Sequence, residues 1–257
     1  MTPDDVRFFD CNEDYSVVWK DLPHWTQAGA LAFVTWRTAD SMPEEVLKEW
    51  NRERDQILVT NGLDPKGNWR QKLRKLPAPN RGRVRWLLFT AWDLRLDYAA
   101  GDCLLADERC SEIVMNSLLH FDGERYIVTD AVIMPNHVHL IAAFQSEEAL
   151  LTQCTSWKHF TATAIRRLQR TVDPPLRRRG FSEPALPNSM KSDAFESQPA
   201  ERLDNSKYQK QAFWQPEQFD HLIRSEAQFR YFRRYIANNP HRANLQPGTF
   251  RHYTRAM

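Results

Sequence analysis

The sequence lacks the features that mark membrane and secreted proteins. No stretch of its 257 residues approaches the roughly 20 apolar residues that a membrane helix needs. The first ten residues, MTPDDVRFFD, lack the charged and then apolar layout of a signal peptide. The four cysteines form no C-x-x-C pair and show no regular spacing. We therefore expect a cytoplasmic protein with reduced thiols and no membrane partner.

The composition is that of an ordinary globular protein. With 42% hydrophobic and 26% charged residues, the chain does not fit collagen, a coiled coil or a wholly disordered protein. Its length fits one domain with insertions, or one large and one small unit.

Basic residues are unevenly distributed, although the net charge is only +2. Segments 66–85, 158–179 and 224–242 hold 20 of the 35 Lys and Arg residues but only 2 of the 33 acidic ones. Such asymmetry is typical of proteins that bind a polyanion. The alternative is that the three segments are solvated helix faces.

Apolar periodicity, caps and turn residues predict separate strands and helices. Strands are expected over 30–36, 125–134, 137–144 and 213–223. Helices are expected over 41–60, from Val84 onward, from Asp107 to the turn at Asp122-Gly123, over 147–170 and over 225–239. Prolines make most of 66–85 a predicted loop, and Pro240 should end the last helix. Because strands and helices do not alternate regularly, we predict an antiparallel α+β sandwich rather than a parallel barrel.

Residues 172–211 differ from the rest of the chain in composition. They contain five prolines and many Ser, Asn and Gln residues, so we expect a flexible linker or insertion. It divides the chain in two. Residues 1–171 should hold the main part of the core, with an N-terminal strand and a helical insertion, and 212–257 should complete it with a strand and a helix.

The segment MPNHVHLI at 134–141 is the first candidate for chemistry. Side chains alternate along a strand, so His137 and His139 should project from one face and Val138 and Leu140 from the other. Two imidazoles about 6 to 7 Å apart along a strand can converge on one divalent ion. The alternative is a pair of hydrogen-bonded structural histidines.

The last predicted helix carries a second candidate. Tyr235 and Asn239 are four residues apart and should share one helix face, next to Arg233 and Arg234. A phenol beside an amide oxygen suits a nucleophile assisted by a metal ion. The alternative is that Tyr235 lies at the edge of the core and Asn239 caps the helix.

Together these motifs resemble the REP-associated tyrosine transposases, which are single-tyrosine HUH transposases. The resemblance rests on four segments in the order of the family: Pro135-Asn136-His137-Val138-His139, Phe213-Trp214-Gln215, Asp220-His221-Leu222-Ile223-Arg224 and Tyr235-Ile236-Ala237-Asn238-Asn239-Pro240. It covers about 30–145 and 212–245. It implies a ferredoxin-like antiparallel sheet flanked by helices, the HUH endonuclease fold, with 40–105 and 172–211 longer than in compact members.

The resemblance also implies a role for each matched residue. His137 and His139 would bind Mg²⁺ or Mn²⁺, with Asn239 as a third ligand. Tyr235 would cut single-stranded or hairpin (REP-like) DNA, leaving a 5′-phosphotyrosine and a free 3′-hydroxyl. The chain would then be a metal-dependent DNA endonuclease and strand transferase active in transposition and recombination, associated with the nucleoid.

The basic segments would supply the DNA contacts. The residues expected to bind DNA are Lys72, Arg74, Lys75, Arg81, Arg83, Lys158, Arg166, Arg233 and Arg234. Trp69 is the tryptophan that we expect to be exposed, where it could stack on an unpaired base. His221 and His241 are the histidines available to take the proton of the phenol.

Three alternatives remain open at this point. Amidohydrolases also place a His-x-His pair on a strand, but in a parallel barrel. A domesticated protein of the same fold could bind hairpin DNA without cutting it. The chain could also form a homodimer in which each subunit receives its tyrosine from the partner, or supply Tyr235 to its own histidines.

Overall fold

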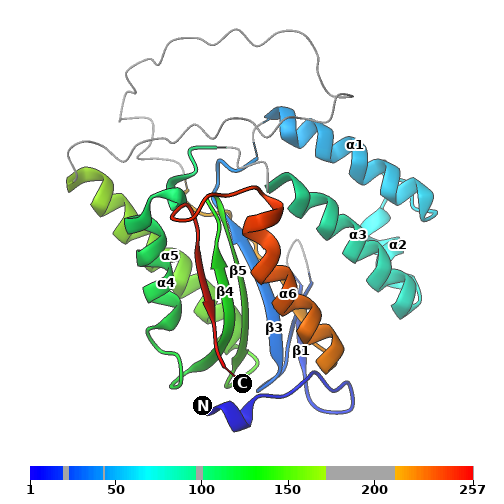
Figure 1. Cartoon of the computed structure of the whole chain (residues 1–257). Coiled ribbons are helices and arrows are strands. Elements are labelled where there is room, and N and C mark those ends of the chain that lie inside the picture. Colours follow the sequence, from blue (N-terminus) through cyan, green and yellow to red (C-terminus); the bar gives the residue numbers. More distant parts are fainter. Residues whose placement is uncertain (20–22, 43, 97–100, 172–211, 257) are drawn as a thin grey trace, which may run out of the picture.

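The computed structural model describes residues 1–19, 23–42, 44–96, 101–171 and 212–256 (Figure 1). The predicted linker or insertion at 172–211 lies outside these residues. No helix in the described part of the chain is both long enough and apolar enough to cross a membrane.

A five-stranded sheet forms the centre of the molecule (Figure 1). Its strands are β3 (Leu31–Arg37), β4 (Tyr126–Ile133), β5 (His137–Phe144), β6 (Phe219–Leu222) and β7 (Arg251–Thr254). They pair in the order β6-β3-β5-β4-β7, and every pairing is antiparallel. The predicted antiparallel α+β arrangement is confirmed, and the parallel barrel of an amidohydrolase is ruled out for the part of the chain that the structure describes.

Helices cover both faces of this sheet. The flanking helices are α4 (Glu108–Leu119), α5 (Ala149–Thr171) and α6 (Glu226–Arg242). On the face covered by α4 and α5, Trp36 of β3 stacks on Trp157 of α5. On the opposite face, which we call the α6 face, Phe33 of β3 stacks on Phe232 of α6. Successive residues of β3 thus enter two different cores, as strand geometry requires.

A group of three helices follows β3 in the chain (Figure 1). They are α1 (Glu44–Thr60), α2 (Trp69–Lys75) and α3 (Ala78–Leu96). The expectation of a loop over most of 66–85 is wrong, because Pro77 and Pro79 lie at the start of α3, where no intrahelical N–H bond is lost. Leu58, Leu63 and Val84 give these helices a small core of their own.

Helix α6 also differs from the prediction, because it continues through Pro240 to Arg242. Proline has a backbone φ compatible with a helix, and only one hydrogen bond of the last turn is lost. The N–H of Ala243 then donates to the carbonyl of Asn239 at 3.1 Å and closes the helix. At the other end, the hydroxyl of Ser225 caps α6 by accepting from the N–H of Gln228 at 3.2 Å.

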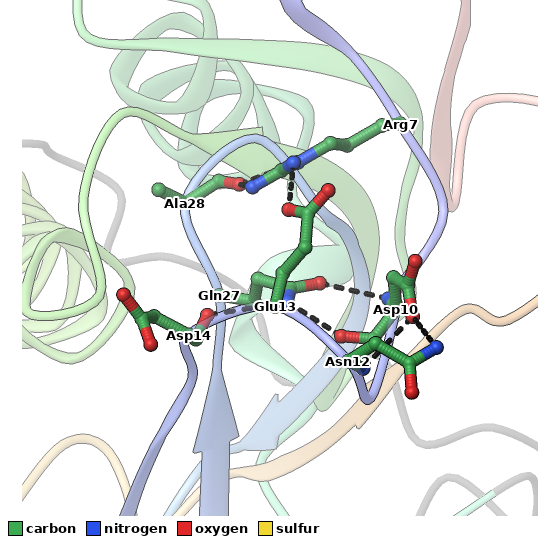
Figure 2. Close-up of polar contacts among 7 residues, drawn as sticks. All are labelled: Arg7, Asp10, Asn12, Glu13, Asp14, Gln27 and Ala28. Carbon is green, nitrogen blue, oxygen red and sulfur yellow. Dashed lines mark hydrogen bonds and ion pairs between the residues drawn. The ribbon is translucent and has the colours of Figure 1, made fainter.

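The N-terminal segment packs against Gln27 and Ala28, which lie shortly before β3 (Figure 2). This segment contains a 3₁₀ turn, η1 (Pro3–Asp5), and a hairpin formed by β1 (Ser16–Trp19) and β2 (Pro23–Thr26). A second 3₁₀ turn, η2 (Leu104–Ala106), lies much later in the chain, directly before α4. The guanidinium of Arg7 donates to the carbonyl of Ala28 at 2.9 and 2.8 Å. The side chain of Gln27 donates to the carbonyl of Asp10 and accepts from its N–H, at 2.8 and 2.9 Å. The short strands β1, β2 and β7 were not predicted.

Candidate metal centre and tyrosine

Strand β5 places its two histidines on the α6 face. His137 and His139 are 0% exposed, and they pair across the sheet with Arg37 and Thr35 of β3. Val138 points into the core on the other face. The predicted alternation of side chains along the strand is confirmed, and both histidines lie in the interior of the protein.

The imidazoles are turned so that their Nε2 atoms face each other. These two atoms are 3.1 Å apart. The Nδ1 of His137 lies 2.7 Å from the side-chain oxygen of Asn136, and the Nδ1 of His139 lies 2.6 Å from the hydroxyl of Thr35. Partners on the Nδ1 side are the usual way in which proteins orient a histidine that binds metal through Nε2.

Burial keeps both histidines neutral. It lowers the pKa of His137 to about 3, helped by the positive charges of Arg242 and Arg37. Burial likewise holds the pKa of His139 well below its ordinary value, helped by His137 and Arg242. Neutral imidazole is the form that binds a metal ion, so no proton has to be displaced at neutral pH.

Asn239 of α6 lies against this pair. Its side chain is fully buried, and its Nδ2 is 3.3 Å from the Nε2 of His139. Its Oδ1 has no hydrogen-bond partner among the described residues. Rotating the amide by 180° exchanges the two atoms and brings the oxygen to the histidines. A buried oxygen without a partner is costly in the absence of a cation, which fits the predicted role of Asn239 as a ligand.

Asp93 of α3 completes the cluster, and sequence reasoning missed it. One of its carboxylate oxygens lies 3.4 Å from the Nε2 of His139, and its side chain is 1% exposed. The ligand atoms of Asp93, His137 and His139 all lie within 4.8 Å of one another. The one signal in the sequence is that Asp93 is the sole acidic residue of α3, a helix with several arginines.

The arrangement fits a divalent cation. Two ligands at right angles on an ion with bonds of about 2.1 Å lie roughly 3.0 Å apart, close to the separation of the two Nε2 atoms. Two imidazoles, an amide and a carboxylate form a mixed nitrogen and oxygen set. Such a set accepts Mn²⁺ as readily as Mg²⁺, since Mg²⁺ prefers oxygen ligands.

Tyr235 lies one helical turn before Asn239, beside the same histidine. The centroid of its ring is 5.4 Å from that of His139 and 5.8 Å from that of Phe33. Its hydroxyl is buried and has no hydrogen-bond partner in the described part of the chain. The guanidinium of Arg242 lies 5.2 Å from the centre of the ring. Tyr235 and Asn239 therefore share one face of α6, as predicted.

Of the residues that we expected near the tyrosine, two bind other groups and two are exposed. Arg233 forms an ion pair with the buried Asp130 at 3.0 Å and donates to the carbonyl of Arg255 at 2.9 Å. His221 accepts from Gln228 at 2.8 Å. His241 and Arg234 are exposed on α6. Arg242, two helical turns after Tyr235, is the cation that lies over its ring, and helical spacing could have identified it.

The basic residues expected to contact DNA fall into three groups. Lys72, Arg74, Lys75, Arg81 and Arg83 lie on α2 and α3, Lys158 and Arg166 on α5, and Arg233 and Arg234 on α6. The ammonium of Lys158 donates to the carbonyl of Pro216 at 2.6 Å and to Gln218 at 2.9 Å, which ties α5 to the segment before β6. Trp69 is half-buried rather than exposed, and the guanidinium of Arg70 lies 4.6 Å from its ring centre.

A cavity of about 550 Å³ lies between α1–α3 and the β3–β6 edge of the sheet. Thr35 and Arg37 form part of its wall. Because these two residues pair with His139 and His137, the cavity begins next to the candidate metal centre.

No family model and no curated protein sequence matches the chain. Among solved structures, it is similar to a REP-associated tyrosine transposase bound to a REP hairpin, with 11% sequence identity and a TM-score of 0.34. The alignment covers 86% of this chain and 73% of that chain. A similarity of this size supports no conclusion about function.

Proposed function

We propose that this chain is a metal-dependent DNA endonuclease and strand transferase of the HUH type, which cuts single-stranded or hairpin DNA through Tyr235. One observation carries the proposal: His137, His139, Asn239 and Tyr235 converge on one face of the sheet. His139 and Asn239 are 100 residues apart in the sequence. Two motifs that each have a structural explanation when taken alone therefore form one buried polar site.

The topology agrees with this proposal. The elements β3, α4, β4, β5, α5 and β6 follow the β-α-β-β-α-β order of a ferredoxin-like sheet. With the strand order β6-β3-β5-β4, the strand bearing the histidines lies near the middle of the sheet, beneath α6. Tyr235 reaches the histidines of its own chain, so we propose that the tyrosine acts in cis.

The reaction would be a phosphoryl transfer to the phenol. As the bond from the Tyr235 oxygen to phosphorus forms, the P–O3′ bond breaks, the phenolic proton is released and the 3′ oxygen takes up a proton. The products are a 5′-phosphotyrosine and a free 3′-hydroxyl, and the ester keeps the strand activated for rejoining. Bound Mg²⁺ or Mn²⁺ would polarise the phosphate. Arg242 places positive charge over the ring, where negative charge develops as the phenol loses its proton.

The ligands that would hold the ion are His137, His139, Asn239 and Asp93. Asn136 and Thr35 would fix the imidazoles through their Nδ1 atoms. We further propose that the basic residues of α2 and α3 supply most phosphate contacts, joined by Arg234. Arg233, by contrast, would serve mainly to hold Asp130.

The test is an assay for a covalent adduct. The protein is incubated with labelled hairpins and single strands from the neighbourhood of its gene, in the presence of Mn²⁺, Mg²⁺ or EDTA. Denaturing gels then show whether a covalent protein–DNA band has formed. We expect a band that requires metal and is lost in Tyr235→Phe, while DNA binding is retained. Tyr231→Phe is the matched control, because Tyr231 lies one turn earlier on α6, is exposed and stacks on Tyr235.

The other outcomes would point to different functions. Binding of hairpins without a band under any condition would indicate a domesticated DNA-binding protein. A band that persists in Tyr235→Phe would show that the nucleophile is another residue. His137→Ala should abolish the band at every metal concentration, because the ion is no longer bound. A band that still forms in this variant without metal would refute the metal centre.

A further inference from the structure

The cavity beside the candidate metal centre contributes no group to the proposed attack of Tyr235 on the phosphate. It lies between the helices α1, α2 and α3 and the edge of the sheet formed by β3 and β6. Its volume of about 550 Å³ falls within the range of about 300–1,000 Å³ that is usual for ligand sites.

The wall of the cavity combines aromatic and cationic side chains. Its tryptophans are Trp25, Trp36, Trp50, Trp69 and Trp92. Its arginines are Arg37, Arg54, Arg70, Arg74, Arg81 and Arg85. Among the lining residues that the structure describes, Glu217 is the one carboxylate. Indole rings stack on bases and guanidinium groups bind phosphates, so this wall has the chemistry of a nucleotide site.

The cavity suits unpaired bases rather than a duplex. Bases in a double helix are stacked on each other and cannot present their faces to a protein side chain, whereas unpaired bases can. Trp50 and Trp92 meet edge to face at 4.9 Å, and the guanidinium of Arg37 lies 4.5 Å from the centre of Trp92. A flat ring entering the cavity would therefore meet aromatic surface and positive charge together.

The position of the cavity relates it to the reacting strand. Arg37, which lines it, is opposite His137 in the sheet, and Thr35, which also lines it, contacts His139. A strand that enters the cavity would thus continue directly to the metal centre and Tyr235.

We propose that this cavity holds unpaired nucleotides of the DNA strand adjacent to the cleaved phosphate, and that α1–α3 form a single-strand binding module attached to the catalytic sheet. This inference rests on the proposed function, because it assumes a DNA strand at Tyr235. It adds a binding site, the residues that form it and the unpaired state of the nucleotides that it takes.

The test measures binding without cleavage. The full-length protein is titrated in EDTA with a labelled single strand of about 12 nucleotides that cannot fold into a hairpin, and anisotropy and tryptophan fluorescence are followed. We expect saturable binding with quenching of tryptophan emission. Trp50→Leu should weaken binding roughly 5- to 100-fold, the range for loss of one base–aromatic stack, and should remove part of the quenching.

Charge reversal provides a matched comparison. Arg70 and Arg74 lie one turn apart on α2, are exposed and line the cavity. Arg52 is equally exposed on α1 but does not line it. We expect Arg70→Glu and Arg74→Glu each to weaken binding about tenfold or more and to lower the salt dependence of the affinity, with a slope change of roughly 0.7 per phosphate contact. Arg52→Glu should change the affinity less than threefold.

Each remaining outcome overturns the inference in a recognisable way. If all variants bind the strand as the parent does while metal-dependent adducts still form on hairpins, the cavity is not the strand site and the proposed function stands. If a free deoxynucleoside monophosphate binds and the strand does not, the cavity is a site for free nucleotides. If neither strands nor hairpins bind, both the inference and the proposed function fail. Circular dichroism checks that Trp50→Leu is folded.

Discussion

The role of Asp93 gives the sharpest prediction, because sequence motifs did not assign it. Asp93→Asn keeps the shape of the side chain and removes its charge 3.4 Å from the Nε2 of His139. Opposite unit charges 4 Å apart attract each other by about 4 kcal/mol at an effective dielectric constant near 20. Dehydration offsets much of this attraction, so we expect a loss of about 1.4 to 2.7 kcal/mol, or 10- to 100-fold in affinity for Mn²⁺.

Thermal unfolding at graded Mn²⁺ concentrations measures this loss. At 100 times the dissociation constant of the parent, binding stabilises the fold by about 2.7 kcal/mol, and a hundredfold weaker site would contribute only about 0.4 kcal/mol. For a chain of this length the difference is roughly 5 to 9 °C in Tm. Asp130→Asn is the control, since Asp130 is an equally buried carboxylate that pairs with Arg233 instead. An unchanged Mn²⁺ response in Asp93→Asn would refute the assignment of Asp93 as a ligand.

Three further predictions concern residues around the site and on α6. Arg242→Gln removes the cation over the ring of Tyr235, so phosphotyrosine formation in single-turnover assays should slow about tenfold or more, with little change in hairpin affinity. Burial lowers the pKa of His221 to about 4, so its contribution to stability is present above pH 6.5 and is lost as the pH falls towards 4. In urea unfolding, His221→Gln should therefore recover about 2 kcal/mol of the stability that the parent loses between pH 7 and 4.5, and an identical pH profile would contradict this. Arg233→Met removes the ion-pair partner of the buried carboxylate of Asp130 and leaves it only the hydroxyl of Thr254 among the contacts described, so the free energy of unfolding should fall by about 2 kcal/mol, whereas a purely DNA-binding Arg233 would leave it unchanged.

Local geometry explains what the sequence could predict. The alternation of a strand fixed which way His137 and His139 point relative to Val138, and the turn of a helix fixed that Tyr235 and Asn239 share a face. Both relations depend only on the local backbone conformation and not on how distant segments pack. Most helices and the main strands were predictable for the same reason, because each has its own apolar periodicity, whereas α2 and the start of α3 were not predicted.

Features that depend on packing between distant segments were not predictable. Asp93 reaches the histidines only because α3 packs against β3 and β6, where Phe89 meets Phe33 edge to face at 5.8 Å and stacks on Phe219 at 4.1 Å. Nothing in the spacing of 40–105 indicates that contact. The strands β1, β2 and β7 are too short for periodicity, and β2 is held by contacts of His24 and Trp25 with Asp220, far along the chain.

Helix α3 connects the candidate metal centre with the cavity. Trp92 and Asp93 are neighbours in sequence, and neighbouring residues on a helix point about 100° apart. Asp93 therefore faces the histidines while Trp92 faces the cavity, where the guanidinium of Arg37 covers it. A nucleotide that moved Trp92 would also move a metal ligand, so strand binding and metal affinity should be coupled through α3. For this reason Arg70, which lies on α2, is a better probe of the cavity than Trp92, whose replacement would disturb both sites at once.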